Sequence, residues 1–541
     1  MVKRVAVIGA GSSGLACIKC CVDEGLEPVC FESSDDIGGL WRFKRTPDVG
    51  LGSIYHSLIT NTSKEMMCFS DFPMPEHFPN YMHNSHTLQY LRLYAQHFDL
   101  LKHIRFQTTV RSVRQRPDFP VSGQWDVLTE DRRGEKERQV FDGVLVCSGQ
   151  YTHPLLPDFP GIDTFPGPYL HSWEYKDPDV FLGKRVLVIG IGNSGGDIAV
   201  EASRVAEKTF LSTKKGSWVV GRMSSSGLPL DMVMIRRCRS LLPKLLPAPV
   251  LNWLGERGLN HRYDHRLYGL QPSHRLLDKR PLINDDLPFR ILLGALLVKP
   301  NVREFRGSAV LFDDGTVEEG IDVAVFCTGY ETKFPFLCPS LTSGPDGELT
   351  LYRHMIPPSL ERPTLAVVGV IQTKGPIMPV AEMQARWATR VIKGLNQLPS
   401  EAKMHEFIER ERKANMESYP SPKLAAVQVH YIPYLDALAR EVGVLPNFLW
   451  LLLCDPRLGI RVFFGPCTPY QFRLRGPGRW EGARQAILTQ WDRVSHPMRT
   501  RLVPESKSST LSCWSHLSGM VVVILAVIAT KRWLSWHLLT P

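Results

Sequence analysis

The sequence predicts an α/β protein built from two parallel-sheet domains, one inserted in the other, followed by a hydrophobic C-terminal tail. Two observations predict the sheets: the glycine-rich segments 9–14 and 190–195 each follow an apolar run directly, residues 5–8 and 186–189. A third predicts the tail, because residues 517–530 carry no charge. At 541 residues the chain is long enough for two or three packed domains.

Each glycine-rich segment has the pattern GxGxxG and indicates a strand, a tight turn and the start of a helix. This is the dinucleotide-binding, Rossmann-like arrangement, in which glycines let the backbone approach a pyrophosphate at the helix N-terminus. One such motif is a weak signal. Two in the same context indicate two dinucleotide sites, and they are typical of an enzyme that passes a hydride from one cofactor to the other.

The first site carries an acidic residue where a dinucleotide ribose is bound. A second predicted strand, residues 27–32, ends in Glu32, about twenty residues past the fingerprint. The turn Gly38-Gly39-Leu40-Trp41 follows, and we expect it to bring backbone and an indole against the cofactor. Because an acid at this position disfavours a 2′-phosphate, the first site suits FAD or NAD better than NADP.

The second site lacks such an acid. Its predicted strand, residues 209–213, runs into Lys214 and Lys215, and Arg222 follows nearby. Cations in place of the acid favour a ribose 2′-phosphate, although a solvated basic turn gives the same pattern. The sequence therefore predicts FAD at the first fingerprint and NADPH at the second.

A third signature lies between the two fingerprints. Residues 165–176 match FxGxxxHxxxYK, with His171 and Tyr175 at the two marked positions. This resembles the identifying sequence of the class B flavoprotein monooxygenases, and specifically of the vertebrate flavin-containing monooxygenases. Four further segments look like that family's motifs over essentially the whole chain, namely residues 58–66, 192–197, 326–330 and 464–470.

The resemblance implies an activity and a set of site residues. In that family NADPH reduces FAD, O2 adds at flavin C4a, and the hydroperoxide oxygenates soft nucleophilic nitrogen and sulfur atoms of small lipophilic amines and sulfides. The resemblance makes Asn61 the catalytic residue and His171 a domain-linking residue. The implied FAD contacts are Gly9, Ala10, Gly11, Ser12, Ser13, Gly14, Glu32, Gly39, Leu40, Trp41, Asn61 and Thr62. The implied NADP contacts are Thr60, Asn61, Gly190, Gly192, Ser194, Gly195, Gly196, Asp197, Lys214, Lys215 and Arg222.

Two other activities stay open. Baeyer–Villiger oxygenation of ketones is one, although its usual signature has tryptophan at the position of Tyr175. A poorly coupled NADPH oxidase, or a weakly active relative that binds the cofactors, is the other. Three positions depart from the family pattern: Lys214 replaces a usual arginine, Gln150 a common histidine, and Ala381 a serine or threonine beside the expected flavin site.

Composition adds broad limits. The net charge of +10 suits anionic cofactors and an anionic membrane face, or an ordinary basic enzyme, and we expect no nucleic-acid partner. The 12 cysteines are typical of a reduced cytosolic protein, and we expect Cys17 and Cys20, despite their CxxC spacing, to pack against the sheet. No spacing indicates a metal site, and homo-oligomer formation is left open.

Two segments predict membrane contact. We expect no signal peptide, because residues 1–4 lead directly into the first predicted strand. Residues 517–530, flanked by Lys531 and Arg532, fall short of the roughly 20 residues that span a bilayer unless residues 513–514 extend them. Residues 236–254 combine arginines with leucines and fit either a helix in the headgroup region or a solvated surface helix. We expect an endoplasmic reticulum membrane protein with its catalytic domains on the cytosolic side.

The expected domain order follows from these signals. The predicted segments are an FAD-binding part at 1–150, an NADPH-binding domain at 161–322 with a membrane-facing insertion at about 232–290, a second FAD-binding part at 323–445, a helical covering region at 446–510 and a membrane-anchor tail at 511–541.

Overall fold

The computed structural model describes residues 2–344, 347–419 and 421–501. Its first sheet is parallel and has the order β20-β7-β1-β2-β3. The strands are β1 (Arg4–Ile8), β2 (Glu27–Phe31), β3 (Ile104–Arg105), β7 (Gly143–Val146) and β20 (Leu365–Val367). The central strands of this first sheet are short apolar runs, as expected where both faces of a parallel sheet are covered.

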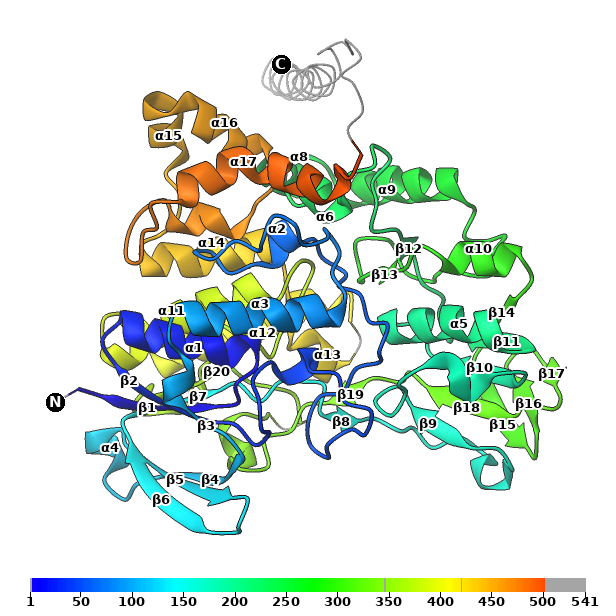
Figure 1. The fold of residues 1–541 in the computed structure, drawn as a ribbon, viewed down its shortest axis with the longest axis horizontal. Helices are drawn as coiled ribbons and strands as arrows, with labels where there is room; N and C mark the ends of the chain where they lie inside the picture. The colour runs from blue at the N-terminus through cyan, green and yellow to red at the C-terminus, as the bar shows by residue number, and fades with distance from the viewer. Residues whose placement is uncertain (1, 345–346, 420, 502–541) are drawn as a thin grey trace, which may run out of the picture.

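The side chains of β1 alternate between two cores. Val5 and Val7 pack in one core with helices α1 (Ser12–Asp23) and α11 (Met378–Lys393), which lie against each other. Ala6 and Ile8 pack in a second core with Trp125 and Phe141. Those aromatic residues belong to an antiparallel sheet of β4 (Thr108–Gln115), β5 (Trp125–Asp131) and β6 (Lys136–Phe141) on the opposite face (Figure 1).

The second parallel sheet repeats this plan and has the order β14-β11-β10-β18-β9. Its strands are β9 (Tyr169–His171), β10 (Arg185–Ile189), β11 (Lys208–Ser212), β14 (Leu296–Lys299) and β18 (Val323–Phe326). Helix α5 (Asn193–Val205) follows β10 and packs on this sheet, and a small antiparallel sheet adjoins it, with β15 (Val302–Arg306), β16 (Ala309–Phe312) and β17 (Val317–Glu318).

The second sheet is inserted between two strands of the first. The chain leaves after β7, builds β9 to β18, and returns at β20. The two connections pair with each other as antiparallel strands β8 (His153–Pro154) and β19 (Tyr330–Glu331). Figure 1 shows this pair between the two sheets. The segments that join the halves are therefore tied together where the chain crosses.

Further helices complete the two halves of the protein. They are α2 (Lys64–Met67), α3 (Asn84–His97), α4 (Phe119–Ser122), α6 (Leu230–Met234), α7 (Arg237–Ser240), α8 (Leu242–Leu245), α9 (Ala248–Arg262), α10 (Leu287–Leu292), α12 (Glu401–Met416), α13 (Pro422–Ala425), α14 (Tyr431–Val442), α15 (Phe448–Cys454), α16 (Pro456–Phe464) and α17 (Ala483–Ser495). Two short strand pairs complete the fold, β12 (Val219–Val220) with β13 (Leu282–Ile283) and β21 (Gln372–Thr373) with β22 (Gln428–Val429).

The predicted surface helix at residues 236–254 needs correction. The structure divides it into α7, α8 and the first part of α9, because Pro243 and Pro247 each start a new helix. Arg237 does not face outward either; it is buried and pairs with Asp436 at 2.7 Å. The predicted anchor tail, residues 511–541, lies outside the described residues. Within the described part, no helix combines the length and apolar character that crossing a membrane requires.

Candidate active site

The first glycine fingerprint joins β1 to α1 with almost no space for side chains. Gly9 has φ +100°, and a Cβ there would lie 2.7 Å from the carbonyl oxygen of Cys147. A Cβ on Gly14 would lie 1.9 Å from the carbonyl oxygen of Gly9. Gly11 has no such clash, because its nearest neighbour would be Gly39 Cα at 3.7 Å. Gly9 and Gly14 therefore build the turn, whereas Gly11 packs against Gly39 with room for a Cβ.

The predicted acid and the predicted turn lie beside this fingerprint. Glu32 follows β2, and its carboxylate accepts hydrogen bonds from the backbone N–H of Ala10 at 2.7 Å and of Ser34 at 2.8 Å. Gly38 donates to the carbonyl of Ala10, which brings Gly39 against Gly11. The remaining predicted contacts are partly accessible at the same edge: Ser12, Ser13, Leu40 and Trp41.

The second fingerprint has the same construction. Gly190 has φ +109°, and a Cβ on Gly195 would lie 1.9 Å from the carbonyl oxygen of Gly190. A Cβ on Gly192 would meet nothing within 4 Å, so this glycine, unlike Gly11, faces open space. Gly196 packs differently, because a Cβ there would lie 2.8 Å from the side chain of Leu282. Ser194 lies in the first turn of α5.

The strand register confirms that the second site lacks the acid. Ile8 pairs with Phe31 in the first sheet, and Ile189 pairs with Ser212 in the second. Thr213 therefore takes the position that Glu32 has in the first sheet. Its hydroxyl accepts from the backbone N–H of Gly216 at 3.0 Å. The exposed Lys214 and Lys215 follow at once, at the sheet edge next to the fingerprint.

The asparagine segment meets the second half of the protein through Arg222. The Nη2 of Arg222 donates to Oδ1 of Asn61 at 2.7 Å, and its Nε donates to the carbonyl of Thr60 at 3.3 Å. The same guanidinium pairs with Asp285 at 2.9 Å. The sequence predicts that Arg222 binds a 2′-phosphate; in this structure its guanidinium holds the asparagine segment. Its role toward the coenzyme stays a prediction.

Asp231 fixes the segment from its other side. Both the N–H and the hydroxyl of Ser63 donate to Oδ2 of Asp231, at 2.6 and 2.9 Å. Burial raises the pKa of Asp231 to about 6. Thr62 lies between these anchors and is partly exposed. No sequence pattern pointed to Asp231 or to the Arg222 contact, because each partner is more than 150 residues distant along the chain.

Asp197 joins the two halves rather than pointing to open space. Its Oδ2 accepts from the hydroxyl of Tyr55 at 2.6 Å, and its Oδ1 accepts from Nδ2 of Asn284 at 2.7 Å. Burial is the main cause that raises the pKa of Asp197. Its predicted contact with NADP stays a prediction, whereas its bond to Tyr55 is a further tie between the first and second halves.

His171 has both ring nitrogens engaged. Its Nδ1 accepts from the backbone N–H of Trp173 at 3.1 Å, so Nε2 carries the proton and donates to the carbonyl of Gly329 at 3.0 Å. Burial lowers the pKa of His171, which keeps the ring neutral. This geometry suits a residue that ties β9 to the second connection, rather than an acid or a base.

Two of the three departures from the family pattern, Gln150 and Ala381, lie inside the fold. The Nε2 of Gln150 donates to the carbonyl of Ile371 at 2.9 Å. Ala381 is buried on α11 and lies near Ser13, since a Cβ on Gly369 would be 2.1 Å from Oγ of Ser13 and 3.7 Å from Cβ of Ala381. Cys17 is buried with its Sγ 3.5 Å from that of Cys147, as free thiols.

Comparison with known proteins gives one consistent family. The Flavin-binding monooxygenase-like model matches residues 2–532. Dimethylaniline monooxygenase [N-oxide-forming] 2 of Rattus norvegicus is 53% identical over 528 residues, covering 97% of this chain and 98% of the relative. Flavin-containing monooxygenase 5 of Oryctolagus cuniculus is 52% identical over 529 residues, covering 97% and 99%.

Solved structures show the same fold at low identity. S-allyl-L-cysteine S-oxygenase from Allium sativum has a TM-score of 0.63 at 24% identity and covers 92% of this chain and 99% of its own. Cyclohexanone monooxygenase from Rhodococcus sp. Phi1 bound to NADP+ has a TM-score of 0.59 at 19% identity and covers 82% and 98%. Because the family model and the close relatives match along nearly the whole length, the chain belongs to the flavin-binding monooxygenase-like family and is a flavin-dependent monooxygenase.

Proposed function

We propose that the protein binds FAD at the first fingerprint and NADPH at the second, and oxygenates soft nitrogen and sulfur atoms of small lipophilic compounds. FAD, once reduced by NADPH, supplies the oxygen chemistry. The names of the close relatives support the substrate class, since they include N-oxide-forming dimethylaniline monooxygenases. The two fingerprints support the cofactors, since Gly11 and Gly192 place backbone without a side chain at the N-termini of α1 and α5.

The observation that carries the proposal is the bond between Asn61 and Arg222. It joins the asparagine segment of the first half to the second half at 2.7 Å. Because Oδ1 of Asn61 accepts from Arg222, the amide orientation is set and its N–H donors are left for NADP+ and oxygen. A neutral amide orients these groups without offering a titratable proton. The residues of the site thus position the reacting groups and shield them from water, and the cofactor carries out the reaction.

The function is tested with purified, FAD-loaded protein in the presence of NADPH and O2. We expect dimethylaniline to yield its N-oxide, with one NADPH consumed for each N-oxide and little hydrogen peroxide. A parallel reaction with a cyclic ketone tests Baeyer–Villiger oxygenation, which would yield a lactone. Lactone without N-oxide would assign the ketone reaction, and stoichiometric peroxide without either product would assign an oxidase.

Coenzyme selection gives a first prediction. Replacing Lys214 and Lys215 with alanine is expected to raise the KM for NADPH about tenfold or more, because each lost charge-assisted bond to the 2′-phosphate is worth about 1.5–3 kcal/mol. The KM for NADH should change little. Steady-state kinetics with both coenzymes provide the measurement. Lys208→Ala, at the opposite end of β11, is the matched control. Equal effects on NADPH and NADH would place the selectivity elsewhere.

The pKa of Asp231 gives a pH prediction. Above about pH 6 its carboxylate is ionised and accepts both bonds from Ser63; below it, protonation weakens this acceptor and loosens the Asn61 segment. We expect the fraction of NADPH lost as hydrogen peroxide to rise as the pH falls through about 6. Asp231→Asn should be poorly coupled at every pH and lack this titration. A parent peroxide fraction that does not change on either side of about pH 6 would contradict the assignment.

Membrane attachment is proposed at the edge of the molecule formed by α8, α9, α15 and α16. Large apolar side chains are exposed there, including Trp253 and Leu254 on α9 and Leu449, Trp450 and Leu453 on α15. The two groups are connected through packed helices, since α9 contacts α8, α8 contacts α7, α7 contacts α16 and α16 contacts α15. Figure 1 shows α17, the last described helix, at the same edge. We propose that the tail and this edge hold the protein on the cytosolic side of the endoplasmic reticulum membrane.

Truncation tests this attachment. Deleting residues 511–541 is expected to shift the protein from the membrane pellet toward the soluble fraction, with flavin content and oxygenation retained. Introducing Trp253→Asp and Leu449→Asp into the truncated chain should release the fraction that remains bound, because both side chains are exposed at the proposed edge. Fractionation in high salt and then detergent measures both steps. Loss of flavin on truncation would show that the tail is part of the folded core.

A further inference from the structure

A cavity lies between α1, α11 and the loop at residues 472–480, apart from both fingerprints. Its volume is about 510 Å³, and none of the glycines of the two fingerprints lines it. Five cationic side chains line it against three acidic ones. The cations are Lys19, Arg386, Arg390, Arg473 and Arg479. An excess of positive charge around a cavity favours an anion.

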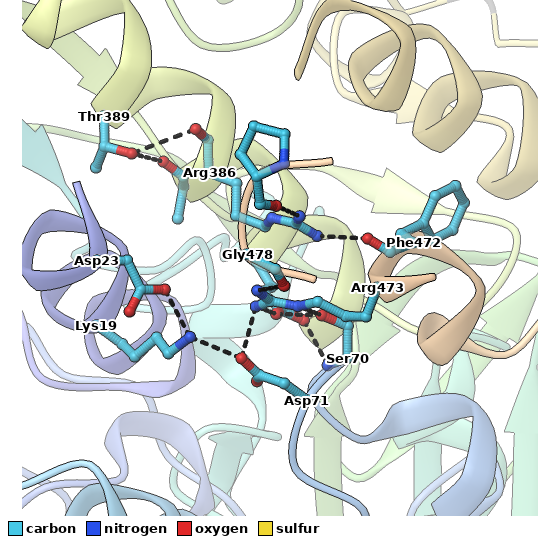
Figure 2. A network of polar contacts seen from close by, with 12 residues as sticks. Lys19, Asp23, Ser70, Asp71, Arg386, Thr389, Phe472, Arg473 and Gly478 are labelled. Carbon is cyan, nitrogen blue, oxygen red and sulfur yellow. Dashed lines mark hydrogen bonds and ion pairs between the residues drawn. The ribbon is translucent and has the colours of Figure 1, made fainter. Parts of the chain in front are cut away.

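One wall of the cavity is a buried ion network centred on Asp71 (Figure 2). Lys19 Nζ lies 2.6 Å from Oδ2 of Asp71, and Nη2 of Arg473 lies 2.8 Å from the same oxygen. The side chain of Asp71 is only 8% exposed. Its other oxygen, Oδ1, is buried and has no hydrogen-bond partner among the described residues. A buried acceptor without a donor costs free energy, so the two cations next to Asp71 are needed to keep its carboxylate in place.

The lining also includes a buried cation that has no acidic partner within the described ranges. Arg386 is 6% exposed and donates to the backbone carbonyls of Phe472 at 3.1 Å and Pro477 at 3.0 Å. In the part of the chain that the structure describes, it makes no ion pair. Burial, reinforced by the charge of Arg473, lowers the pKa of Arg386 to about 10. An anion close to this guanidinium would favour its charged form and offset the cost of burying it.

The loop at 472–480 is shaped around these groups. Gly478 has φ +68°, and a Cβ there would lie 2.5 Å from Nη1 of Arg473, so only glycine brings the loop this close. Its neighbour Arg479 is exposed at the cavity rim and makes no ion pair among the described residues. Trp480 and Phe98 add aromatic surface to the lining.

We propose that this cavity binds a small phosphate ester that carries hydroxyl groups, of the size of a sugar phosphate. Arg386 and Arg479 would hold its phosphate, and a hydroxyl would donate to the carboxylate of Asp23, which lines the cavity and has a side chain 39% exposed. Aromatic surface from Trp480 and Phe98 would contact the carbon skeleton. This site is additional to the flavin and NADPH sites. It lies at the C-terminal parts of α1 and α11, whereas the first turns of both helices lie near the first fingerprint.

Calorimetry with ribose 5-phosphate on the FAD-loaded protein tests the site. The measurement is made with saturating NADP+, which blocks binding at the coenzyme site. We expect saturable binding at a single site, weaker binding of inorganic phosphate, and none of ribose. Arg479→Ala should weaken binding at least about tenfold, as for one charge-assisted bond. Arg475→Ala is the matched control, because Arg475 is exposed on the same loop and does not line the cavity.

Three results would overturn the proposal. The first is an absence of binding by the parent protein. The second is binding that is detected only in a titration without NADP+, which would place the ligand at the coenzyme site. The third is equal weakening by Arg479→Ala and Arg475→Ala, which would indicate attraction by the net charge alone. Both substitutions are at exposed positions, so the fold and the bound flavin are expected to be unchanged.

Discussion

Gly11→Val is expected to yield a folded protein without flavin. Gly11 has φ −74°, which any residue adopts, and a Cβ there would have an ordinary 3.7 Å contact with Gly39. The fold therefore tolerates a side chain at this position. The side chain would instead occupy the surface where the pyrophosphate meets the helix N-terminus. Gly9 and Gly14 would not give so clear a test, because a side chain at either would collide with backbone carbonyls.

Flavin absorbance per mole of protein measures the outcome, with circular dichroism and thermal melting as evidence of folding. The matched control is Gly192→Val, at the equivalent place in the second fingerprint, where a Cβ meets nothing within 4 Å. That variant should remain yellow and lose reduction by NADPH. A Gly11→Val protein with normal flavin content would show that the first fingerprint does not hold FAD.

Much of the fold could be predicted from local sequence. The apolar runs before the fingerprints and the glycine spacing identify both parallel sheets, because strand, turn and helix signals all lie within a short window. The breaks in residues 236–254 could also have been predicted, since Pro243 and Pro247 are visible in the sequence. The prediction of a helix over residues 236–254 was wrong because it used only the mixture of arginines and leucines and ignored the positions of the prolines.

The contacts between the halves could not be predicted in the same way. Arg222 is predicted from its charge near the second fingerprint, but its partners depend on how the two sheets dock. The burial of Arg237 depends on Asp436, which is 199 residues away along the chain. No spacing rule applies across such separations. Asn61 itself was found through the family resemblance, because an asparagine in a loop has no periodic signal of its own.

Asn61→Ser is expected to uncouple the enzyme while leaving reduction of FAD by NADPH slowed only modestly. The shorter side chain loses the bond that Oδ1 of Asn61 accepts from Arg222 at 2.7 Å, together with the amide N–H donors. A hydrogen bond to a charged partner is worth about 1.5–3 kcal/mol. The rate of oxygen transfer should therefore fall about ten- to a hundredfold. Oxygen that is not transferred is released as hydrogen peroxide.

The measurement combines NADPH consumption, peroxide release and N-oxide formation from dimethylaniline. Arg222→Gln removes the same bond from the other partner, so it should raise the peroxide fraction in the same direction. Because both substitutions remove the bond between Arg222 and Asn61, the double variant should be less impaired than the sum of the two single effects. If the Asn61→Ser protein couples as well as the parent, Asn61 has only a structural role. Additive effects of the two substitutions would show that Arg222 acts independently of Asn61.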